Sequence, residues 1–301
     1  MKIGYPCINR SIGCSTNRAF RLKSYCDERF LTTVTQNLDC LLRVLFYNQQ
    51  HNLLFFRISS DVIPFASHTI ITYNWPEYFK EKFATIGVFI KNAHMRISMH
   101  PDQFVVLNSK DARIVESSIS ELRYHAQLLD ALGLDTTAKI QIHVGGAYGD
   151  KSAAMQRFIA TYSTLDTSIK RRLVIENDDR LFSMQDCLFI HEHTGIPIIF
   201  DVLHHEVLNN GESVHNALQL ALNTWQHTDT RQDGIGMVDY SSQASDSRVG
   251  KHAETLDTAH FKKFITDTQD LDFDIMLEIK DKEFTALKAL DIAQNIRKNL
   301  Y

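Results

Sequence analysis

Short apolar runs alternate along the chain with longer segments in which apolar residues recur at helical spacing. This pattern predicts eight strands, each of which precedes a helix. The expected strands are Lys2–Tyr5, Leu53–Ile58, Arg96–Met99, Lys139–Ile142, Arg172–Ile175, Ile196–Phe200, Ile235–Val238 and Asp274–Leu277. The expected helices lie near Glu28–Asn48, Tyr78–Ala93, Asp111–Leu132, Lys151–Tyr162, Met184–Thr194, Ser213–Leu222, Asp257–Thr266 and Glu283–Lys298.

Strands that are separated by helical crossovers must run parallel to one another. Eight such units in 301 residues predict an α/β protein with a closed (β/α)8 barrel, the TIM-barrel fold. No Gly/Ser-rich linker or charged tail divides the sequence, so we expect a single domain over residues 1–301. The alternative is an open doubly wound sheet, but no Gly-x-Gly-x-x-Gly motif follows the first strand.

The barrel predicts where functional side chains lie, because active sites of this fold are built at the carboxyl ends of the strands. His204 comes three residues after Asp201, and His252 lies in the loop after the seventh strand. The third to eighth strands each end on an acid or an imidazole, namely His100, His143, Glu176, Asp201, Asp239 and Glu278. A closed barrel would bring all eight side chains to one face.

These eight residues offer imidazole and carboxylate groups without thiolate, which is a ligand set of zinc, manganese and iron sites. One zinc ion needs about four ligands. Eight candidates therefore predict a cluster of two or three divalent ions, with Glu176 and Glu278 as candidate bridges. Such clusters activate water and stabilise the attacking and leaving oxygens of phosphoryl transfer.

A single histidine at a strand end is more often structural, so it is the joint pattern that indicates a metal site. The other ten histidines are expected to be solvated or to lie at the edge of the core: His51, His68, His94, His125, His191, His193, His205, His215, His227 and His260. His205 adjoins His204 and could orient that ligand.

The composition, 44% apolar and 23% charged, is ordinary for a globular protein, and no apolar run approaches the ~20 residues that span a bilayer. The first residues lack the apolar region of a signal peptide. Five cysteines without a Cys-x-x-Cys motif argue against a disulfide framework or a thiolate zinc site and favour the cytoplasm. Cys40 and Cys187 fall in amphipathic helical patterns and are expected in or near the core.

The formal net charge of −4, taken alone, argues against a nucleic-acid partner. Four of the candidate ligands are carboxylates, however, and two or three divalent ions would more than offset their charge. Basic residues beside the expected strand ends could also meet a phosphate backbone: Arg10, Arg18, Arg21, Arg57, Arg180, Arg248 and Lys251.

The chain resembles the UV damage endonucleases, a family of TIM-barrel DNA repair nucleases related to endonuclease IV. The resemblance covers nearly the whole chain, and many motifs carry it in the right order. They are Gly4–Cys7 with Asn9, Thr16–Arg18, Phe56–Ser60, Pro64–His68, Ser98–Phe104, His143–Lys151, Glu176–Asp179, Asp201–His205, Asp239–Gln243 with His252, and Glu278–Glu283.

The resemblance implies an endonuclease that acts on damaged double-stranded DNA with a divalent metal cluster, manganese in particular. It would nick the damaged strand immediately 5′ to cyclobutane dimers and 6-4 products, and would also act at abasic sites. The expected mechanism is in-line attack by a metal-bound hydroxide, which leaves a 3′-hydroxyl. The expected catalytic residues are His143, Glu176 and Glu278, with Lys280 stabilising phosphate charge.

The family's lesion probe falls on Gln103 and Phe104, which would fill the gap left by an extruded dinucleotide. The second probe residue is tyrosine in other members. Tyr5 and Asn9 match positions that hold the extruded lesion or nearby backbone. The DNA-binding set is therefore Tyr5, Asn9, Arg10, Arg57, Gln103, Phe104, Arg248 and Lys251.

Two local features depart from the family pattern. Asp239 stands where some members have histidine, which favours harder ions. Ile235–Met237 lacks the lysine that is modified in some members.

Three rival functions remain open: an abasic-site endonuclease of the endonuclease IV type, a sugar isomerase of the same barrel superfamily, and a catalytically silent barrel. An exposed Gln103–Phe104 loop does not suit the closed pocket of a sugar isomerase. We expect a monomer without an obligate protein partner or a membrane association. Its expected place is the cytoplasm, with the nucleoid if the source is bacterial.

Overall fold

The computed structural model describes residues 1–225 and 233–298. Eight parallel strands hydrogen-bond in chain order, and β8 returns to β1, so the sheet closes into a barrel. The strands are β1 (Ile3–Pro6), β2 (Phe55–Ile58), β3 (Arg96–Met99), β4 (Lys139–His143), β5 (Leu173–Glu176), β6 (Ile198–Asp201), β7 (Gly236–Tyr240) and β8 (Phe273–Leu277). The predicted (β/α)8 barrel is confirmed.

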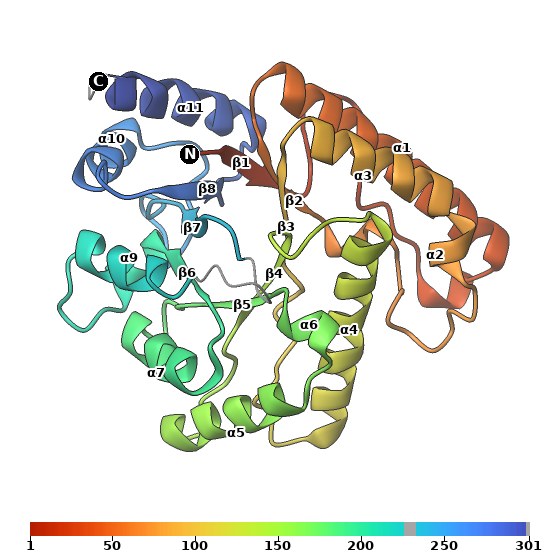
Figure 1. Ribbon diagram of the computed structural model, residues 1–301, viewed down its shortest axis with the longest axis horizontal. Coiled ribbons are helices and arrows are strands. Elements are labelled where there is room, and N and C mark those ends of the chain that lie inside the picture. The colour runs from red at the N-terminus through yellow and green to blue at the C-terminus, as the bar shows by residue number, and fades with distance from the viewer. Residues whose placement is uncertain (226–232, 299–301) are drawn as a thin grey trace.

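The helices surround the barrel as an outer ring (Figure 1). The long ones are α1 (Asp27–Gln50), α3 (Lys80–Asn92), α4 (Ala112–Ala131), α5 (Lys151–Thr164), α7 (Met184–Thr194), α9 (Val214–Leu222), α10 (Thr258–Asp267) and α11 (Glu283–Lys298). Short helices are α2 (Trp75–Tyr78), α6 (Thr167–Lys170) and α8 (Val202–Val207), with 3-10 turns at η1 (Leu22–Ser24) and η2 (Ser60–Val62). Among the described residues, no helix is long and apolar enough to cross a membrane.

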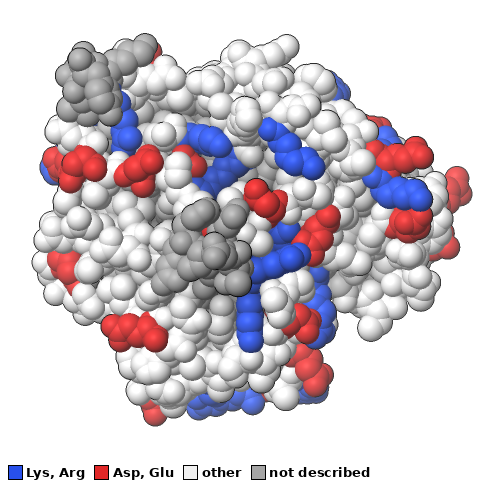
Figure 2. All heavy atoms as spheres, in the orientation of Figure 1, with Lys and Arg blue, Asp and Glu red and all other residues white. Residues whose placement is uncertain are grey.

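The order β1 to β8 runs clockwise in Figure 1. For right-handed β-α-β connections, this order turns the amino-terminal ends of the strands toward the viewer. Figure 2, drawn in the same orientation, shows acidic and basic side chains intermixed on that end of the molecule. The carboxyl ends of the strands therefore lie on the far side.

Alternation along the strands sorts their side chains between the barrel interior and the helix layer. An apolar layer in the middle of the barrel consists of Phe55, Val174, Ile199, Met237 and Met276. Two residues later in their strands come Arg57, Glu176, Asp201, Asp239 and Glu278, which form a polar layer toward the carboxyl ends. The larger apolar core fills the space between the strands and the helices.

The sequence placed the strands well but missed some boundaries. His143, Glu176 and Asp201 are the last residues of their strands, whereas we expected them just beyond the ends. β6 begins at Ile198 rather than Ile196, because Pro197 has no N–H to donate to the ladder. The single helix expected over Tyr78–Ala93 is two helices, α2 and α3.

One expectation about the cysteines is wrong. A disulfide joins Cys14, in the loop after β1, to Cys40 in α1. Cys40 and Cys187 are both buried, as predicted. The disulfide ties a long loop at the carboxyl end of β1 to the helix that follows it.

Candidate metal centre

Strand register brings the candidate ligands side by side at the carboxyl end of the barrel. His143 of β4 pairs with Glu176 of β5, and Asp201 of β6 pairs with Asp239 of β7. Since all the strands run parallel, their carboxyl ends share one rim. The residues that we expected at this rim are therefore neighbours in space.

Two groups of side chains are compact enough to hold an ion each. The first consists of His100, His143 and Glu176, and the second of Asp201, Asp239 and Glu278. Within each group, one ligand atom from every residue lies within 4.8 Å of the others. His143 Nε2 lies 2.9 Å from Glu176 Oε1, the shortest imidazole–carboxylate contact among these residues.

His204 and His252 complete the ring of candidates. The ring centroid of His204 lies 5.9 Å from that of His143 and 5.9 Å from that of His252. The structure thus brings together all eight side chains that the sequence singled out. What sequence reasoning left open was their division into two groups linked by these imidazoles.

Backbone carbonyls orient three of the four imidazoles. Nδ1 lies 2.8 Å from Pro101 O in His100, 3.0 Å from Asn177 O in His204 and 2.8 Å from Glu278 O in His252. Donation from Nδ1 leaves Nε2 as the free lone pair, which is how proteins commonly prepare histidine for a metal ion. This geometry supports a ligand role for these rings.

Arg57 and Gln141 lie beneath the carboxylates, and sequence reasoning missed this layer. Arg57 Nη2 donates to Asp239 Oδ1 at 2.8 Å and to Gln141 Oε1 at 2.8 Å, while Nη1 contacts Glu278. The Gln141 amide contacts Glu176 and Asp239. Each residue stands two positions before a strand end on the inner face, so the alternation of the strands could have revealed them.

The expectation that Arg57 meets a DNA phosphate is not supported. Its side chain is only 3% exposed and is turned into the barrel. A guanidinium that is occupied by two carboxylates and sealed from solvent cannot reach a bound duplex. Its place makes it a counter-charge for the candidate metal ligands instead.

Burial and neighbouring charges shift the pKa values of the cluster. Burial opposes protonation of His143, but Glu176 outweighs it and raises the pKa of His143 to about 9. Burial likewise opposes protonation of His204, and Asp201 raises the pKa of that imidazole to about 9. Burial would raise the pKa of Glu278, but Arg57 lowers it to about 2. Clustered shifts of this kind are typical of functional sites.

The residues present fit divalent cations. Asp201 Oδ2 and His143 Nδ1 are buried without a hydrogen-bond partner, which is costly unless another group compensates them. Four carboxylates converge here, and Arg57 is the one arginine that pairs with them among the described residues. Oxygen and imidazole donors without thiolate suit zinc, manganese or iron.

An open pocket of about 720 Å³ lies above the cluster. Gln103, expected in the lesion probe, lines it together with His143, His204 and His252. Arg248, Lys251 and Lys280 add positive charge to its wall. Lys280 also contacts the exposed Glu254, so its ammonium group is held at the rim of the pocket.

The neighbouring Phe104 is 76% exposed, far more than a large apolar side chain that serves the core. It lines a second pocket beside the loop Ser60–His68. Arg10, also expected to bind DNA, is exposed, and its backbone N–H donates to Glu283. The exposed members of the predicted DNA-binding set therefore lie where a duplex could reach them.

Tyr5 and Asn9 do not lie on the surface that we expected for them. Tyr5 is fully buried, and its hydroxyl donates to Asn48 Oδ1 at 2.6 Å while accepting from Asn9 Nδ2 at 2.8 Å. Asn9 Oδ1 accepts from the backbone N–H groups of Ser11 and Ile12. Both residues shape the loop after β1 from within, so direct contact with a lesion is not supported.

The remaining histidines follow the expected division with two exceptions. His125 and His205 are fully buried rather than at the edge of the core. His205 Nε2 lies 3.1 Å from Glu212 O, so it does not orient His204 through that nitrogen. His227 lies outside the described residues.

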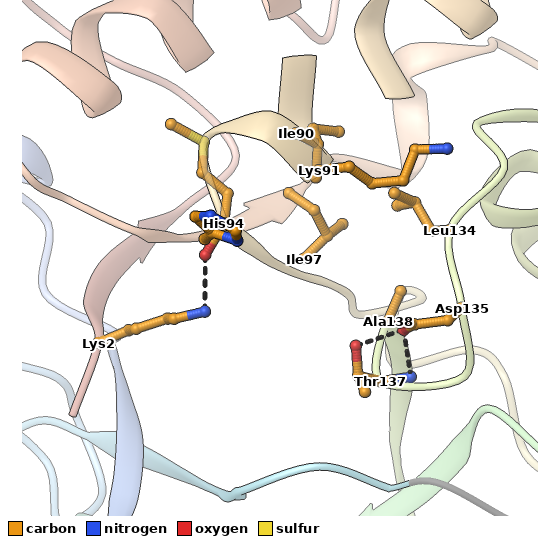
Figure 3. A pocket seen from close by; sticks show the side chains of 10 residues that line it. Lys2, Ile90, Lys91, His94, Ile97, Leu134, Asp135, Thr137 and Ala138 are labelled. Atoms are coloured by element: carbon orange, nitrogen blue, oxygen red, sulfur yellow. Dashed lines mark hydrogen bonds between the residues drawn. The ribbon is translucent and has the colours of Figure 1, made fainter. Parts of the chain in front are cut away.

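A separate pocket lies at the opposite end of the barrel, where the strands begin (Figure 3). Lys2 Nζ there donates to His94 O at 2.6 Å, and Asp135 accepts from Thr137. No acid–imidazole group of the described residues converges on this pocket. The chemistry is thus confined to the carboxyl end.

Fold and site together define the class of protein. A (β/α)8 barrel with converging acids and imidazoles is shared with endonuclease IV from Thermus thermophilus, with a TM-score of 0.60 over 86% of this chain and 94% of that one. At 13% identity, this likeness shows the fold alone. The chain belongs to the UV-endonuclease UvdE family, whose model matches residues 2–299.

Two relatives show how close this relationship is. A UV DNA damage endonuclease of Clostridium perfringens (strain 13 / Type A) is 40% identical over all of this chain and 72% of the relative. The crystal structure of SacUVDE superposes with a TM-score of 0.93 at 46% identity, over 99% of both chains. The chain is therefore an enzyme, an endonuclease of UV-damaged DNA, and the sugar isomerase and silent-barrel alternatives lose their support.

Proposed function

We propose that the enzyme nicks the damaged strand immediately 5′ to cyclobutane dimers and 6-4 products and leaves a 3′-hydroxyl. The same reaction would open abasic sites. The observation that carries this proposal is the convergence of eight imidazoles and carboxylates on one pocket at the carboxyl end of the barrel. Family membership supplies the substrate, UV-damaged DNA.

The residues that would hold two or three divalent ions, manganese in particular, are those of the cluster. His100, His143 and Glu176 would hold one ion, and Asp201, Asp239 and Glu278 another. His204 and His252 adjoin both groups through His143 and Glu278. When bound, such ions supply Lewis acidity and neutralise charge on a phosphodiester.

The protein's own side chains would position the reacting groups. Arg57 and Gln141 hold the carboxylates of Asp239, Glu176 and Glu278 from below, so the upper oxygens face the pocket. Preorganised polar groups of this kind stabilise developing charge without having to reorganise. Lys280, at the rim, would contact the phosphate on the 5′ side of the lesion.

Gln103 and Phe104 would stabilise the distorted duplex. Extruding a damaged dinucleotide costs a few kcal/mol, less where the lesion has already weakened stacking. An exposed aromatic ring that enters the gap offsets this cost by about 1–3 kcal/mol per stacked base. At 76% exposure, Phe104 can make this contact without unfolding its loop. Arg10, Arg248 and Lys251 would bind the flanking phosphates.

We further propose that the enzyme acts as a monomer on chromosomal DNA, which in a bacterial cell lies in the cytoplasm. One chain contributes all eight candidate ligands, so no second subunit is needed to complete the site.

A labelled duplex with one cyclobutane dimer tests the proposal. We expect a single nick on the lesion strand after manganese is added to metal-free enzyme, with a 3′ end that a polymerase can extend. His143→Ala and Glu278→Gln should abolish the nick, whereas His215→Asn, on the exposed surface of α9, should not. Equal cleavage of the undamaged duplex, or a cut on the 3′ side, would contradict the proposal.

A further inference from the structure

Tyr148 is an exposed aromatic residue at the edge of the pocket above the candidate metal centre. Its side chain is 41% exposed, and the same pocket is lined by Gln103, His143 and His204. A molecule that reaches those imidazoles through the pocket therefore passes the Tyr148 ring. Phe104 is the other large exposed aromatic on the loops of this region.

The backbone at Tyr148 is unusual for a residue with a side chain. Its φ is 53°, in the left-handed region that glycine adopts freely and tyrosine rarely does. Glycines surround it at 145, 146 and 149, and a Cβ at Gly146 would lie 2.9 Å from the Tyr148 ring. Strain of this kind concentrates at functional sites, since it lowers stability without benefit to the fold.

Neighbouring side chains hold the ring in place. Lys110 Nζ donates to Tyr148 O at 3.1 Å and lies 5.9 Å from the ring centroid, and Arg157 Cζ lies 5.4 Å from it. Asn108 donates to Gly146 O and accepts from Arg157 Nε, both at 2.9 Å. The ring is thus fixed before any ligand binds, and it carries two cations beside it.

We propose that Tyr148 stacks on an unpaired base of the bound DNA, next to the damaged nucleotides, and so positions the lesion strand over the metal centre. Every base offers a π-face, and stacking on a fixed ring loses little conformational freedom. Lys110 is exposed and could contact the adjoining phosphate. The inference rests on the extrusion of the lesion described under the proposed function.

Tyr148→Gly separates a role in DNA binding from a role in the fold. Glycine suits the observed φ, so this variant should unfold at a temperature no lower than that of the wild type. Removal of the ring should weaken binding to a duplex with one cyclobutane dimer about tenfold and leave binding to the undamaged duplex unchanged. Tyr148→Phe keeps the π-face and should bind within about twofold of the wild type.

Affinities are measured by fluorescence anisotropy in a Glu278→Gln background, which prevents cleavage, and 2-aminopurine beside the dimer reports on stacking. In the cleavage-competent enzyme, Tyr148→Gly should raise KM with little change in kcat. Tyr78→Ala, which removes a 54% exposed tyrosine from α2, is the control.

A Tyr148→Gly variant that keeps full lesion preference would overturn the stacking role alone, and so would an equal loss in Tyr78→Ala. A wild type that shows no preference for the dimer would instead overturn the proposed function, and this inference with it.

Discussion

Arg57 and Asp239 form an ion pair inside the barrel, with Arg57 Nη2 2.8 Å from Asp239 Oδ1 and 2.9 Å from Oδ2. Their side chains are 3% and 0% exposed, so water screens neither charge. The pair joins β2 to β7 directly beneath the candidate metal ligands. Asp239 therefore has a cationic partner before any ion binds, which limits how far it can turn toward the pocket.

Arg57→Met should destabilise the metal-free protein. Removing one partner of a buried pair leaves an uncompensated charge and typically costs about 3–5 kcal/mol. Arg57→Lys should recover part of the loss, since it restores charge without the two-pronged geometry. Urea unfolding of the metal-free enzyme measures both, and added manganese should narrow the gap because bound ions compensate the same carboxylates.

The control for this series is Arg113→Met, which breaks an exposed pair with Asp111 on α4. Exposed pairs contribute little, so no measurable change in the urea midpoint is expected. An Arg57→Met enzyme as stable as the wild type without metal would show that Arg57 is not needed to compensate the acids.

Metal affinity should rise with pH. In the metal-free protein, Glu176 and Asp201 raise the pKa values of His143 and His204 to about 9. Both imidazoles are then protonated at neutral pH, and a protonated imidazole cannot bind an ion. Each ion that takes up one of them must release a proton, so affinity should increase by about tenfold per pH unit and level off above about pH 9.

Calorimetric titration of manganese in buffers with different ionisation enthalpies counts the released protons. His215→Asn serves as the control, because His215 also has a raised pKa, beside Asp270, but lies on the exposed surface of α9. A manganese affinity that stays constant between about pH 6.5 and pH 8.5 would contradict the assignment of His143 and His204 as ligands.

Phe104→Ala should weaken binding to lesion-containing DNA. Loss of one base–aromatic stack costs about 1–3 kcal/mol, which corresponds to a drop in affinity of roughly 5- to 150-fold. Phe104→Tyr should bind like the wild type, since the ring is retained. The matched control is Phe46→Ala, which removes a 48% exposed phenylalanine from α1, outside the pocket. Equal affinities for Phe104→Ala and the wild type would remove Phe104 from the lesion probe.

The disulfide between Cys14 and Cys40 should be detectable by thiol counting. In protein unfolded without reductant, Cys7, Cys26 and Cys187 should titrate, and all five cysteines should titrate after reduction. Closing a loop of 26 residues stabilises a fold by about 3 kcal/mol on the chain-entropy account. Reduction should therefore lower the unfolding temperature, whereas five reactive thiols before reduction would exclude the bond.

Strand ends could be predicted well because apolar runs and the polar residues that terminate them are local signals. His143, Glu176 and Asp201 each end such a run, and closure of the barrel brings them together whatever the details of the loops. His252 could be assigned only by resemblance, since its place depends on the bridge between Gln243 and His252 within a loop.

Other features depend on contacts between distant segments. Arg57 and Gln141 sit within strands, and their charge or amide reads as an interruption of an apolar run until the inner face is known. Tyr5 was expected at the surface, but its partner Asn48 lies 43 positions away in α1. The same holds for Cys14 and Cys40, which pair only because the loop after β1 folds back over that helix.

The most direct test of the central claim, that these eight side chains form a divalent metal cluster, is the number of ions bound per chain. Metal-free enzyme is dialysed to equilibrium against manganese, and the bound metal is measured by elemental analysis. We predict two or three ions per chain, reduced by at least one in Glu176→Gln and in Glu278→Gln. Fewer than two ions in the wild type would contradict the account.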